Sequence, residues 1–289
     1  MKWLSFNHPE GERPGVLVGD DQVLDIAGQW PQWPRSWRQL LAAGIDKEIA
    51  RLVDAGNFES RHVQPLSSIR FAPPVPDTSK VVALGRNYGA HAAEQNRKAS
   101  EQPMLFAKAP SCLVGHEATV IVPAHESKPD FEAEMALVIG RTAKAVEVDD
   151  ALSHVAGVTA FNDVSGREAQ FSDRLWFRGK GFDTFGPVGP WVVSSDEIGD
   201  PDDLGIKMVV NGEVRQEART AEMVVPTAEI IAFVSRQMTL FPGDIIVTGT
   251  PAGVGVFQDP PIFLQDGDRM EVHLEGVGIL ANSVRREMG

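Results

Sequence analysis

The stretch that says most about the fold of this chain is Asp130-Phe-Glu-Ala-Glu-Met-Ala-Leu-Val-Ile-Gly140. Its second half is an apolar run that ends at a glycine, which predicts a buried strand. Its first half places Glu132 and Glu134 two residues apart, so in a strand their side chains point to the same face. Two such charges repel each other unless a cation neutralises them, and a divalent cation with oxygen ligands would do so. The alternative is an exposed strand end with alternating charge, and the stretch alone does not separate the two.

The composition restricts the class of protein. The chain has 289 residues and a formal net charge of −13, so it is long enough for one large or two modest domains, and we expect no nucleic acid as a partner. Cys112 is the only cysteine, which excludes an internal disulfide and a thiolate zinc site. No apolar run approaches the ~20 residues that span a bilayer, and the N-terminus has no signal-like segment. We therefore expect a cytoplasmic location and no membrane partner.

Two parts of the chain differ in pattern. Residues 1–72 are predicted to form a small N-terminal α/β domain, which the proline-rich segment 71–77 connects to a second domain at residues 73–289. In this second part, short apolar strands alternate with turns such as Asn211-Gly212, and the clearest helix covers residues 226–238. Many strands and few helices predict an α+β domain built on a rolled or sandwiched sheet.

A first candidate for chemistry is Gly85-Arg-Asn-Tyr-Gly-Ala-His-Ala-Ala-Glu94, which follows a predicted strand and opens a helix. His91 and Glu94 are three residues apart, so they meet on one helical face. A carboxylate beside an imidazole orients the ring and raises its basicity, as a general base requires. The alternative is an ordinary surface His–Glu pair. A dinucleotide site is not expected, because Gly-x-Gly-x-x-Gly is absent.

A second candidate is a group of three carboxylates at strand ends. Asp163 follows the apolar strand at 157–161, and it joins Glu132 and Glu134. Such a set suits an octahedral Mg²⁺ or Mn²⁺ that keeps open positions for substrate. Zinc is less favoured, because no histidine lies within a few residues of these acids. The alternative for Asp163 is a turn residue that caps its own loop.

Positive and hydroxyl-bearing residues complete the candidates. Lys108, Arg167 and Lys180 supply positive charge near the acids, although most lysines are simply solvated. A strand ends at Thr248-Gly-Thr-Pro251, where hydroxyls and free amides could bind a carboxylate. The phosphate-loop pattern is missing, so we expect no nucleotide.

Several stretches, taken in this order, resemble the fumarylacetoacetate hydrolase superfamily across residues 80–282. The likeness is greatest for its domain-containing-protein-2 branch and for bacterial 2,4-diketo-acid and sugar-acid enzymes. The matching stretches are Gly85–His91 with Glu94, Asp130–Glu134, Asn162–Arg167, Gly179–Phe185, Asn211–Glu213 with Gln216, and Pro242–Gly255.

The resemblance implies a β-roll catalytic domain, a homodimer, and Mg²⁺ or Mn²⁺, with Ca²⁺ as a stand-in in crystals. The ion would be held by Glu132, Glu134 and Asp163. His91 and Glu94 would form the acid–base dyad, with Lys180 as a further catalytic residue. Asp130 is left out of the ligand set by analogy alone, since its spacing would place it on the same face. The substrate-contacting residues that the resemblance implies are Arg86, Tyr88, Lys108, Arg167, Gln170 and Thr250.

The resulting hypothesis is hydrolysis of a C–C bond in a small anionic 2-oxo acid of the 2,4-diketo (acylpyruvate) type. His91, oriented by Glu94, would deprotonate the attacking water, and Lys180 would help to stabilise the enolate. The same chemistry serves a 2-oxo-acid decarboxylase, a hydroxydienedioate isomerase, and a keto-sugar-acid lyase or dehydratase, and the sequence does not separate these. A binding protein on the same fold and a structural dimer that clamps Ca²⁺ are the non-enzymatic alternatives.

Overall fold

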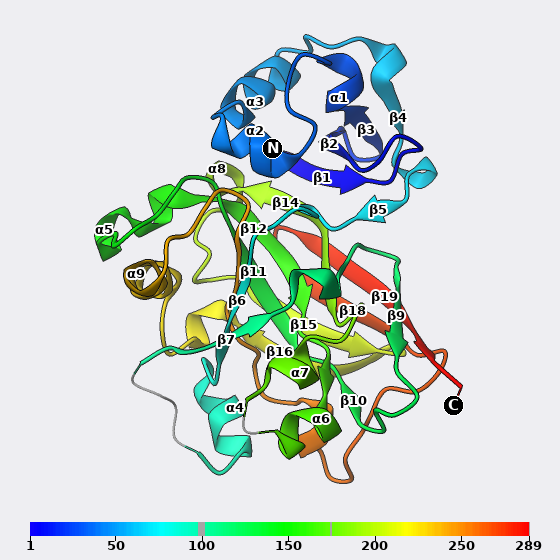
Figure 1. Ribbon diagram of the computed structural model, residues 1–289, viewed down its shortest axis with the longest axis vertical. Helices are drawn as coiled ribbons and strands as arrows, with labels where there is room; N and C mark the ends of the chain where they lie inside the picture. The colour runs from blue at the N-terminus through cyan, green and yellow to red at the C-terminus, as the bar shows by residue number, and fades with distance from the viewer. Residues whose placement is uncertain (98–101, 174, 289) are drawn as a thin grey trace.

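The N-terminal segment forms an antiparallel sheet with short helices packed on it, at the top of Figure 1. The computed structural model describes residues 1–97, 102–173 and 175–288. Trp3 and Trp37 stack inside this segment with their ring centroids 4.6 Å apart. The elements of the segment are β1 (Lys2–Phe6), β2 (Arg13–Val18), β3 (Gln22–Asp25), α1 (Ile26–Gln29), α2 (Trp37–Ala42), α3 (Asp46–Asp54), β4 (Val63–Pro65) and β5 (Phe71–Ala72).

A long mixed sheet continues from this segment into the rest of the chain. β1 pairs antiparallel with β14 (Gly186–Ser194), so that Lys2 lies opposite Val193. The strand order from there is β14-β12-β11-β17-β6-β7. The predicted boundary at residues 72 and 73 therefore falls within one hydrogen-bonded sheet, and the division into two domains stays a prediction. The remaining strands of this sheet are β6 (Val81–Gly85), β7 (Met104–Lys108), β8 (Leu113–Val114), β11 (Ala133–Ile139), β12 (Val155–Asn162) and β17 (Ile245–Val247).

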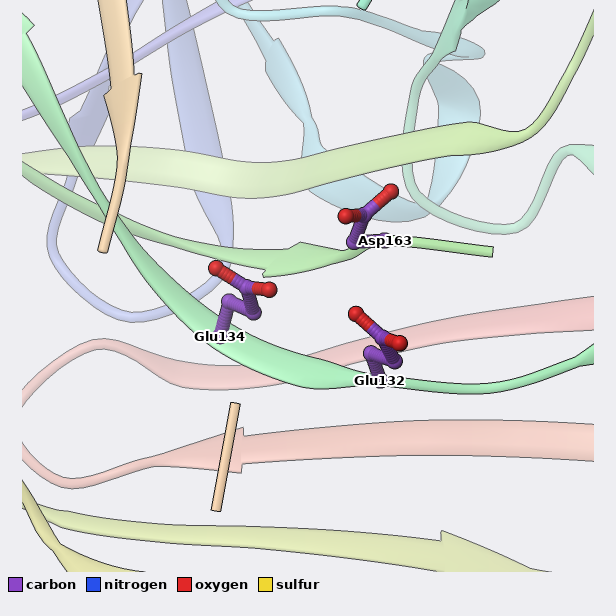
Figure 2. Close-up of side chains that lie close together, drawn as sticks. All are labelled: Glu132, Glu134 and Asp163. Atoms are coloured by element: carbon purple, nitrogen blue, oxygen red, sulfur yellow. The ribbon is translucent and has the colours of Figure 1, made fainter. Parts of the chain in front are cut away.

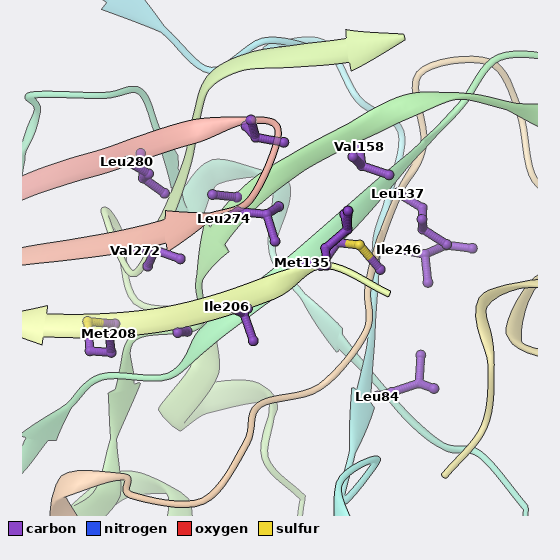
Figure 3. Packing of buried hydrophobic residues seen from close by; sticks show 14 of the residues in the cluster. Leu84, Met135, Leu137, Val158, Ile206, Met208, Ile246, Val272, Leu274 and Leu280 are labelled. Atoms are coloured by element: carbon purple, nitrogen blue, oxygen red, sulfur yellow. The ribbon is translucent and has the colours of Figure 1, made fainter. Parts of the chain in front are cut away.

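A second sheet of five strands packs against the long one and closes the roll. On β18, Met270, Val272 and Leu274 alternate with more exposed residues, so one face of the strand is buried. All three belong to the same apolar core as Met135 and Leu137 of β11. Figure 3 shows Val272 and Leu274 with these two residues. The elements outside the long sheet are β9 (Thr119–Val122), β10 (Pro129–Asp130), β13 (Ser165–Gly166), β15 (Gly205–Val210), β16 (Glu213–Arg219), β18 (Arg269–Leu274), β19 (Gly278–Arg286), α4 (Gly89–Glu94), α5 (Val148–Ala151), α6 (Arg167–Ser172), α7 (Phe177–Lys180), α8 (Ser195–Ile198) and α9 (Thr227–Gln237).

This architecture confirms the predicted α+β class with a rolled sheet. The stretch 130–140 is buried throughout, and the predicted strand is β11, which covers Ala133–Ile139. It is buried along its whole length because it lies centrally in the long sheet and is covered on both faces. In the described part of the chain, no helix is long and apolar enough to cross a membrane.

The strand directions bring the strand ends that carry the candidate site residues together at one edge of the long sheet. β6 and β17 are parallel, whereas β11 runs antiparallel to both β17 and β12. The carboxyl ends of β6, β12 and β17 therefore lie beside the beginning of β11. α4, α6 and α7 cluster at this end, the lower end in Figure 1.

Candidate active site

Three carboxylates meet at this edge because of strand register. Ala133 lies opposite Asn162 in the β11–β12 pairing, so the next pair outward is Glu132 and Asp163, and the Asp163 amide donates to the Glu132 carbonyl at 2.9 Å. Glu134 follows two residues after Glu132 on the same face. Side chains that are directly opposite or two apart lie within contact range. Figure 2 shows the side chains of Glu132, Glu134 and Asp163 close together, with the two glutamates rising from the same ribbon.

Buried cations surround these acids. The Lys180 ammonium donates to Glu132 and to Asp163, at 2.7 Å each. Lys108 donates to the other oxygen of Asp163 at 2.5 Å and also to the Lys180 carbonyl. Arg167 bridges Glu132 and Asp130, at 2.8 Å from each. All these side chains are almost completely withdrawn from water, so each depends on its partners for charge balance.

The charge balance of this group leaves a negative excess. Among the described residues, three cations contact the four carboxylates of Asp130, Glu132, Glu134 and Asp163, namely Lys108, Lys180 and Arg167. Although burial opposes its charged form, Lys180 and Arg167 lower the pKa of Glu132 to about 2. Burial, together with the charges of Asp163 and Glu132, raises the pKa of Glu134 well above its ordinary value. Glu134 is therefore the carboxyl group at which a further negative charge is least favourable, and a proton or a bound cation would relieve it.

The donor set fits a hard divalent cation. Glu132, Glu134 and Asp163 can each offer one oxygen, and these oxygens lie within 4.8 Å of one another, close to the separation of ~4–5 Å between ligands on opposite sides of one ion. Glu134 accepts the Gly249 amide at 2.5 Å through one oxygen, and no described residue bonds its other oxygen. Oxygen ligands and an excess negative charge favour Mg²⁺ or Mn²⁺ over softer metals.

In the structure, Asp130 makes hydrogen bonds that its spacing in the sequence did not predict. One oxygen of Asp130 accepts the Gly255 amide at 2.8 Å, and the other accepts Arg167 and the Val256 amide. Asp130 thus joins Arg167 to the loop after β17. Its exclusion from the ligand set, made by analogy, now has a geometric basis in these bonds.

The predicted dyad lies on α4, immediately after β6. His91 Nδ1 is 3.0 Å from one oxygen of Glu94, and the other oxygen of Glu94 accepts the Gly253 amide at 2.8 Å. Gly253 has a φ of +103°, and a Cβ there would lie 2.2 Å from the Arg215 carbonyl oxygen. Only glycine therefore allows the loop to approach Glu94 in this way.

A cavity of about 160 Å³ joins the dyad to the carboxylates. Its lining combines charged and polar side chains with apolar ones, and Phe106, Trp176 and Phe257 are among its aromatic residues. The lining residues are Leu84, Gly85, Arg86, His91, Gln95, Phe106, Glu132, Glu134, Arg167, Gln170, Phe171, Trp176, Lys180, Thr250 and Phe257.

Comparison with known proteins identifies the family of this chain. Residues 80–285 match the family described as fumarylacetoacetate (FAA) hydrolase, C-terminal. The chain belongs to the fumarylacetoacetate hydrolase family. The resemblance seen in the sequence is thereby confirmed, and members of this family include enzymes of several reaction types.

Relatives of this family member carry different activities. A mitochondrial oxaloacetate tautomerase of Bos taurus is 40% identical over 289 residues, with 98% of this chain and 91% of that protein covered. A 2,4-didehydro-3-deoxy-L-rhamnonate hydrolase of Sphingomonas sp. is 40% identical over 282 residues, with 96% and 94% covered. The solved structure of a 2-hydroxyhepta-2,4-diene-1,7-dioate isomerase from Mycobacterium marinum is 35% identical, with a TM-score of 0.79 and both chains covered completely.

Most of the predicted substrate contacts line the cavity. Arg86, Arg167, Gln170 and Thr250 all do. The Thr250 hydroxyl is already engaged, since it donates to the Ala133 carbonyl at 2.9 Å and accepts Gln216 at 2.7 Å. The structure therefore gives Thr250 a role in holding the start of β11.

Two predicted substrate contacts do not line the cavity. Lys108 is buried beneath Asp163, so it positions that carboxylate and is placed away from a ligand. Tyr88 is 2% exposed within the core cluster, and its hydroxyl has no partner among the described residues. Burial raises the pKa of Tyr88, so its hydroxyl stays neutral. The structure thus does not support substrate contact for either residue.

Sequence reasoning missed Gln95, which lines the cavity beside the dyad. Its side-chain amide lies 2.9 Å from His91 Nε2, and its oxygen accepts Arg86 Nε at 2.9 Å. The signal was available, because Gln95 follows His91 by four residues and shares its helical face.

Proposed function

We propose that this chain is a divalent-metal-dependent enzyme that hydrolyses a C–C bond in a small 2,4-diketo acid. The observation that carries the proposal is the cavity itself, which brings an imidazole–carboxylate dyad to a centre of buried carboxylates and cations. At about 160 Å³ the cavity is smaller than the ~300–1,000 Å³ that drug-sized ligands occupy, in keeping with a small acid as substrate.

The proposed metal would be Mg²⁺ or Mn²⁺, held by Glu132, Glu134 and Asp163. When bound, it would supply Lewis-acid polarisation of substrate oxygens. With a divalent ion the centre changes from a negative to a positive excess, so it would attract an anion despite the net charge of −13. The ion thereby accounts for how an acidic protein holds an acidic substrate.

His91 is the proposed general base. Glu94 accepts from Nδ1, which leaves the lone pair on Nε2, the ring nitrogen that can take a proton from water. The hydroxide so formed adds to the distal carbonyl of the substrate. The C–C bond then breaks, its electron pair stays on the carbon next to the 2-oxo group, and that carbon later takes a proton to give the second product.

Lys180 is proposed to act as a fixed cation. Burial alone would lower its pKa, but Asp163 and Glu132 raise the pKa above its ordinary value, so Lys180 remains an ammonium and is unsuited as a base. Two of its three N–H groups point at carboxylates, and the residue lines the cavity. The remaining N–H can stabilise negative charge that develops on the substrate.

The second candidate function is keto–enol tautomerisation of a small 2-oxo dicarboxylate. Arg86 favours it, since this guanidinium lines the cavity beside Trp176, at 5.8 Å from the ring, where a distal carboxylate could bind. The oxaloacetate tautomerase among the relatives supports the same reading. Here His91 would move a proton between carbon and oxygen, and no water would be consumed.

A substrate panel separates the two functions. Purified enzyme is incubated with acylpyruvates and with oxaloacetate, each with Mg²⁺, with Mn²⁺ and after chelation. Hydrolysis predicts two carboxylic products from acylpyruvate, whereas tautomerisation predicts faster loss of the enol absorbance of oxaloacetate without cleavage. If calorimetry shows that the enzyme binds metal and ligand but turns over no member of the panel, both functions are refuted.

The homodimer also remains a proposal. Light scattering on the protein as it elutes from a size-exclusion column tests it.

A further inference from the structure

Four polar groups form a continuous chain from the cavity wall to the loop after β17. Arg86 Nε donates to Gln95 Oε1 at 2.9 Å, and Gln95 Nε2 lies 2.9 Å from His91 Nε2. His91 Nδ1 then lies 3.0 Å from Glu94. Gln95 is thus the one described residue that bonds both the cavity-lining guanidinium and the ring of the proposed base.

The chemistry of Arg86 decides how the Gln95 amide is oriented. The two ends of an amide are exchanged by a half-turn, so the orientation must be argued from the partners. A guanidinium carries only donors, so the end that faces Arg86 must be the oxygen. The NH₂ end must then face His91, and Nε2 of the ring must accept.

The orientation of Gln95 in turn decides which ring nitrogen carries the proton. A neutral imidazole has one donor and one acceptor nitrogen. Because Nε2 accepts from Gln95, Nδ1 carries the proton and donates to Glu94. The opposite tautomer would set two donors face to face at Gln95 and leave the Glu94 oxygen opposite a lone pair.

We infer that Gln95 is a positioning residue that, oriented by Arg86, holds His91 in the Nδ1–H tautomer with its basic lone pair on Nε2. The inference rests on the proposed function for the role of His91 as a base. Gln95 also covers that lone pair. An anionic group of the substrate that pairs with Arg86 would compete for the guanidinium and free Gln95, so that the base becomes available when substrate is present.

The test is ¹⁵N NMR of the full-length enzyme with Mg²⁺, labelled at histidine and measured at neutral pH. The chain has seven histidines, and His91→Gln identifies the His91 signals by their loss. The wild type should show a protonated Nδ1 and an unprotonated Nε2. In Gln95→Leu the two tautomers should mix, and kcat should fall roughly threefold to tenfold, as loss of one hydrogen bond implies.

Two further variants test whether the orientation of the Gln95 amide, and not merely its contact with His91, determines the tautomer. Gln95→Glu keeps the shape but has no donor, so both ring nitrogens should become protonated. Arg86→Met leaves Gln95 free to turn, so it should mix the tautomers although Gln95 is unchanged. Gln237→Leu, at an exposed glutamine that ends α9, is the matched control and should leave the His91 signals as in the wild type.

The outcomes distinguish this inference from the proposed function. A wild-type enzyme with Nε2 protonated, or a Gln95→Leu variant with unchanged tautomer and kcat, would overturn the inference even if 2-oxo acids are turned over. The predicted tautomer in an enzyme that turns over none of them would support the role of Gln95 and reject His91 as their base. Addition of malonate, a small dianion without a keto group, should shift the His91 Nε2 signal in the wild type, and no shift would reject the release of Gln95.

Discussion

The carboxylate centre and the α4 segment lie on two sides of one cavity, yet they are built differently. The centre is held by paired strands, and its lysines and acids are almost completely buried. The α4 segment is one short helix, in which Glu94 keeps 21% of its side-chain surface exposed. The centre thus resembles a fixed framework of charge, whereas the dyad depends on a few side-chain hydrogen bonds. Mutations in the α4 segment should therefore change mainly catalysis, whereas mutations in the centre should change mainly stability and metal binding.

The largest effect should come from the α4 side. His91→Ala should lower kcat by ~10²–10⁴, the usual contribution of a general base, while Mg²⁺ affinity stays nearly unchanged, because His91 is outside the three-carboxylate set. Steady-state kinetics and calorimetry measure the two quantities. His154→Ala is the control, since His154 pairs with Asp150 away from the cavity. If His91→Ala instead lost Mg²⁺ binding and kept its turnover, the two regions would not have these separate roles.

The next largest effect should be a loss of stability when a residue of the carboxylate centre is changed. Lys108→Met removes a cation from a fully buried pair, so the free energy of unfolding should fall by ~3–5 kcal/mol. Lys207→Met removes a cation from an exposed pair with Glu217 and should cost less than ~1 kcal/mol. Urea unfolding followed by circular dichroism compares them. Equal losses in the two variants would contradict the view of the centre as a charge framework.

Substitution of two aspartates in the centre, one at a time, tests which of the acids bind the metal. Asp163→Asn should weaken Mg²⁺ binding by more than the ~10–100-fold expected when an outer partner is lost, and Asp130→Asn by no more than that. Both substitutions preserve shape, so they differ in the role of the carboxylate. Titration calorimetry provides the measurement. If both variants lose affinity equally, Asp130 is a ligand, as its spacing in the sequence allowed.

The smallest effect should be a dependence of stability on pH. Burial and the charges of Asp163 and Glu132 raise the pKa of Glu134 well above its ordinary value of 4.5, so in the metal-free chain the folded state holds a proton that the unfolded state has lost. Stability should therefore fall as pH rises above about 4.5, by at most ~1.4 kcal/mol per pH unit, until the raised pKa is passed.

Glu134→Gln should remove this decrease of stability with rising pH, whereas Glu217→Gln, at an exposed glutamate, should not. Thermal unfolding of the chelated protein across pH measures it. Added Mg²⁺ must displace the same proton, so its affinity should increase with pH over the same window. An identical slope in Glu134→Gln and the wild type would show that the proton is held elsewhere.

Much of the fold was predictable, because it follows from local patterns. The apolar run in 130–140 predicted β11, and the alternation at 270–275 predicted β18. The spacing of His91 and Glu94 predicted their contact, which the structure shows at 3.0 Å. Each of these depends on residues near in sequence, for which strand and helix periodicity is a sufficient guide.

The partners of the buried charges were not predictable in this way. Lys108 and Asp163 are 55 residues apart in sequence, and nothing local to either indicates that they pair. For that reason a substrate role was assigned to Lys108, whereas the structure places it beneath the carboxylate. Tyr88 is a similar case, since its motif does not reveal that the side chain is buried in the core.

The amino-acid sequence was enough to predict the rolled α+β class and, through its resemblance, the family. It also predicted that Glu132 and Glu134 share a strand face and that His91 and Glu94 share a helical face, because spacing along a strand or helix decides which side chains point the same way. Three relations became visible with the folded chain: which charges neutralise one another, why the partners of Asp130 differ from those of Glu132, and how Gln95 joins Arg86 to His91. Those relations arise where β6, β11, β12 and β17 converge, and they depend on strand order and register across the whole chain.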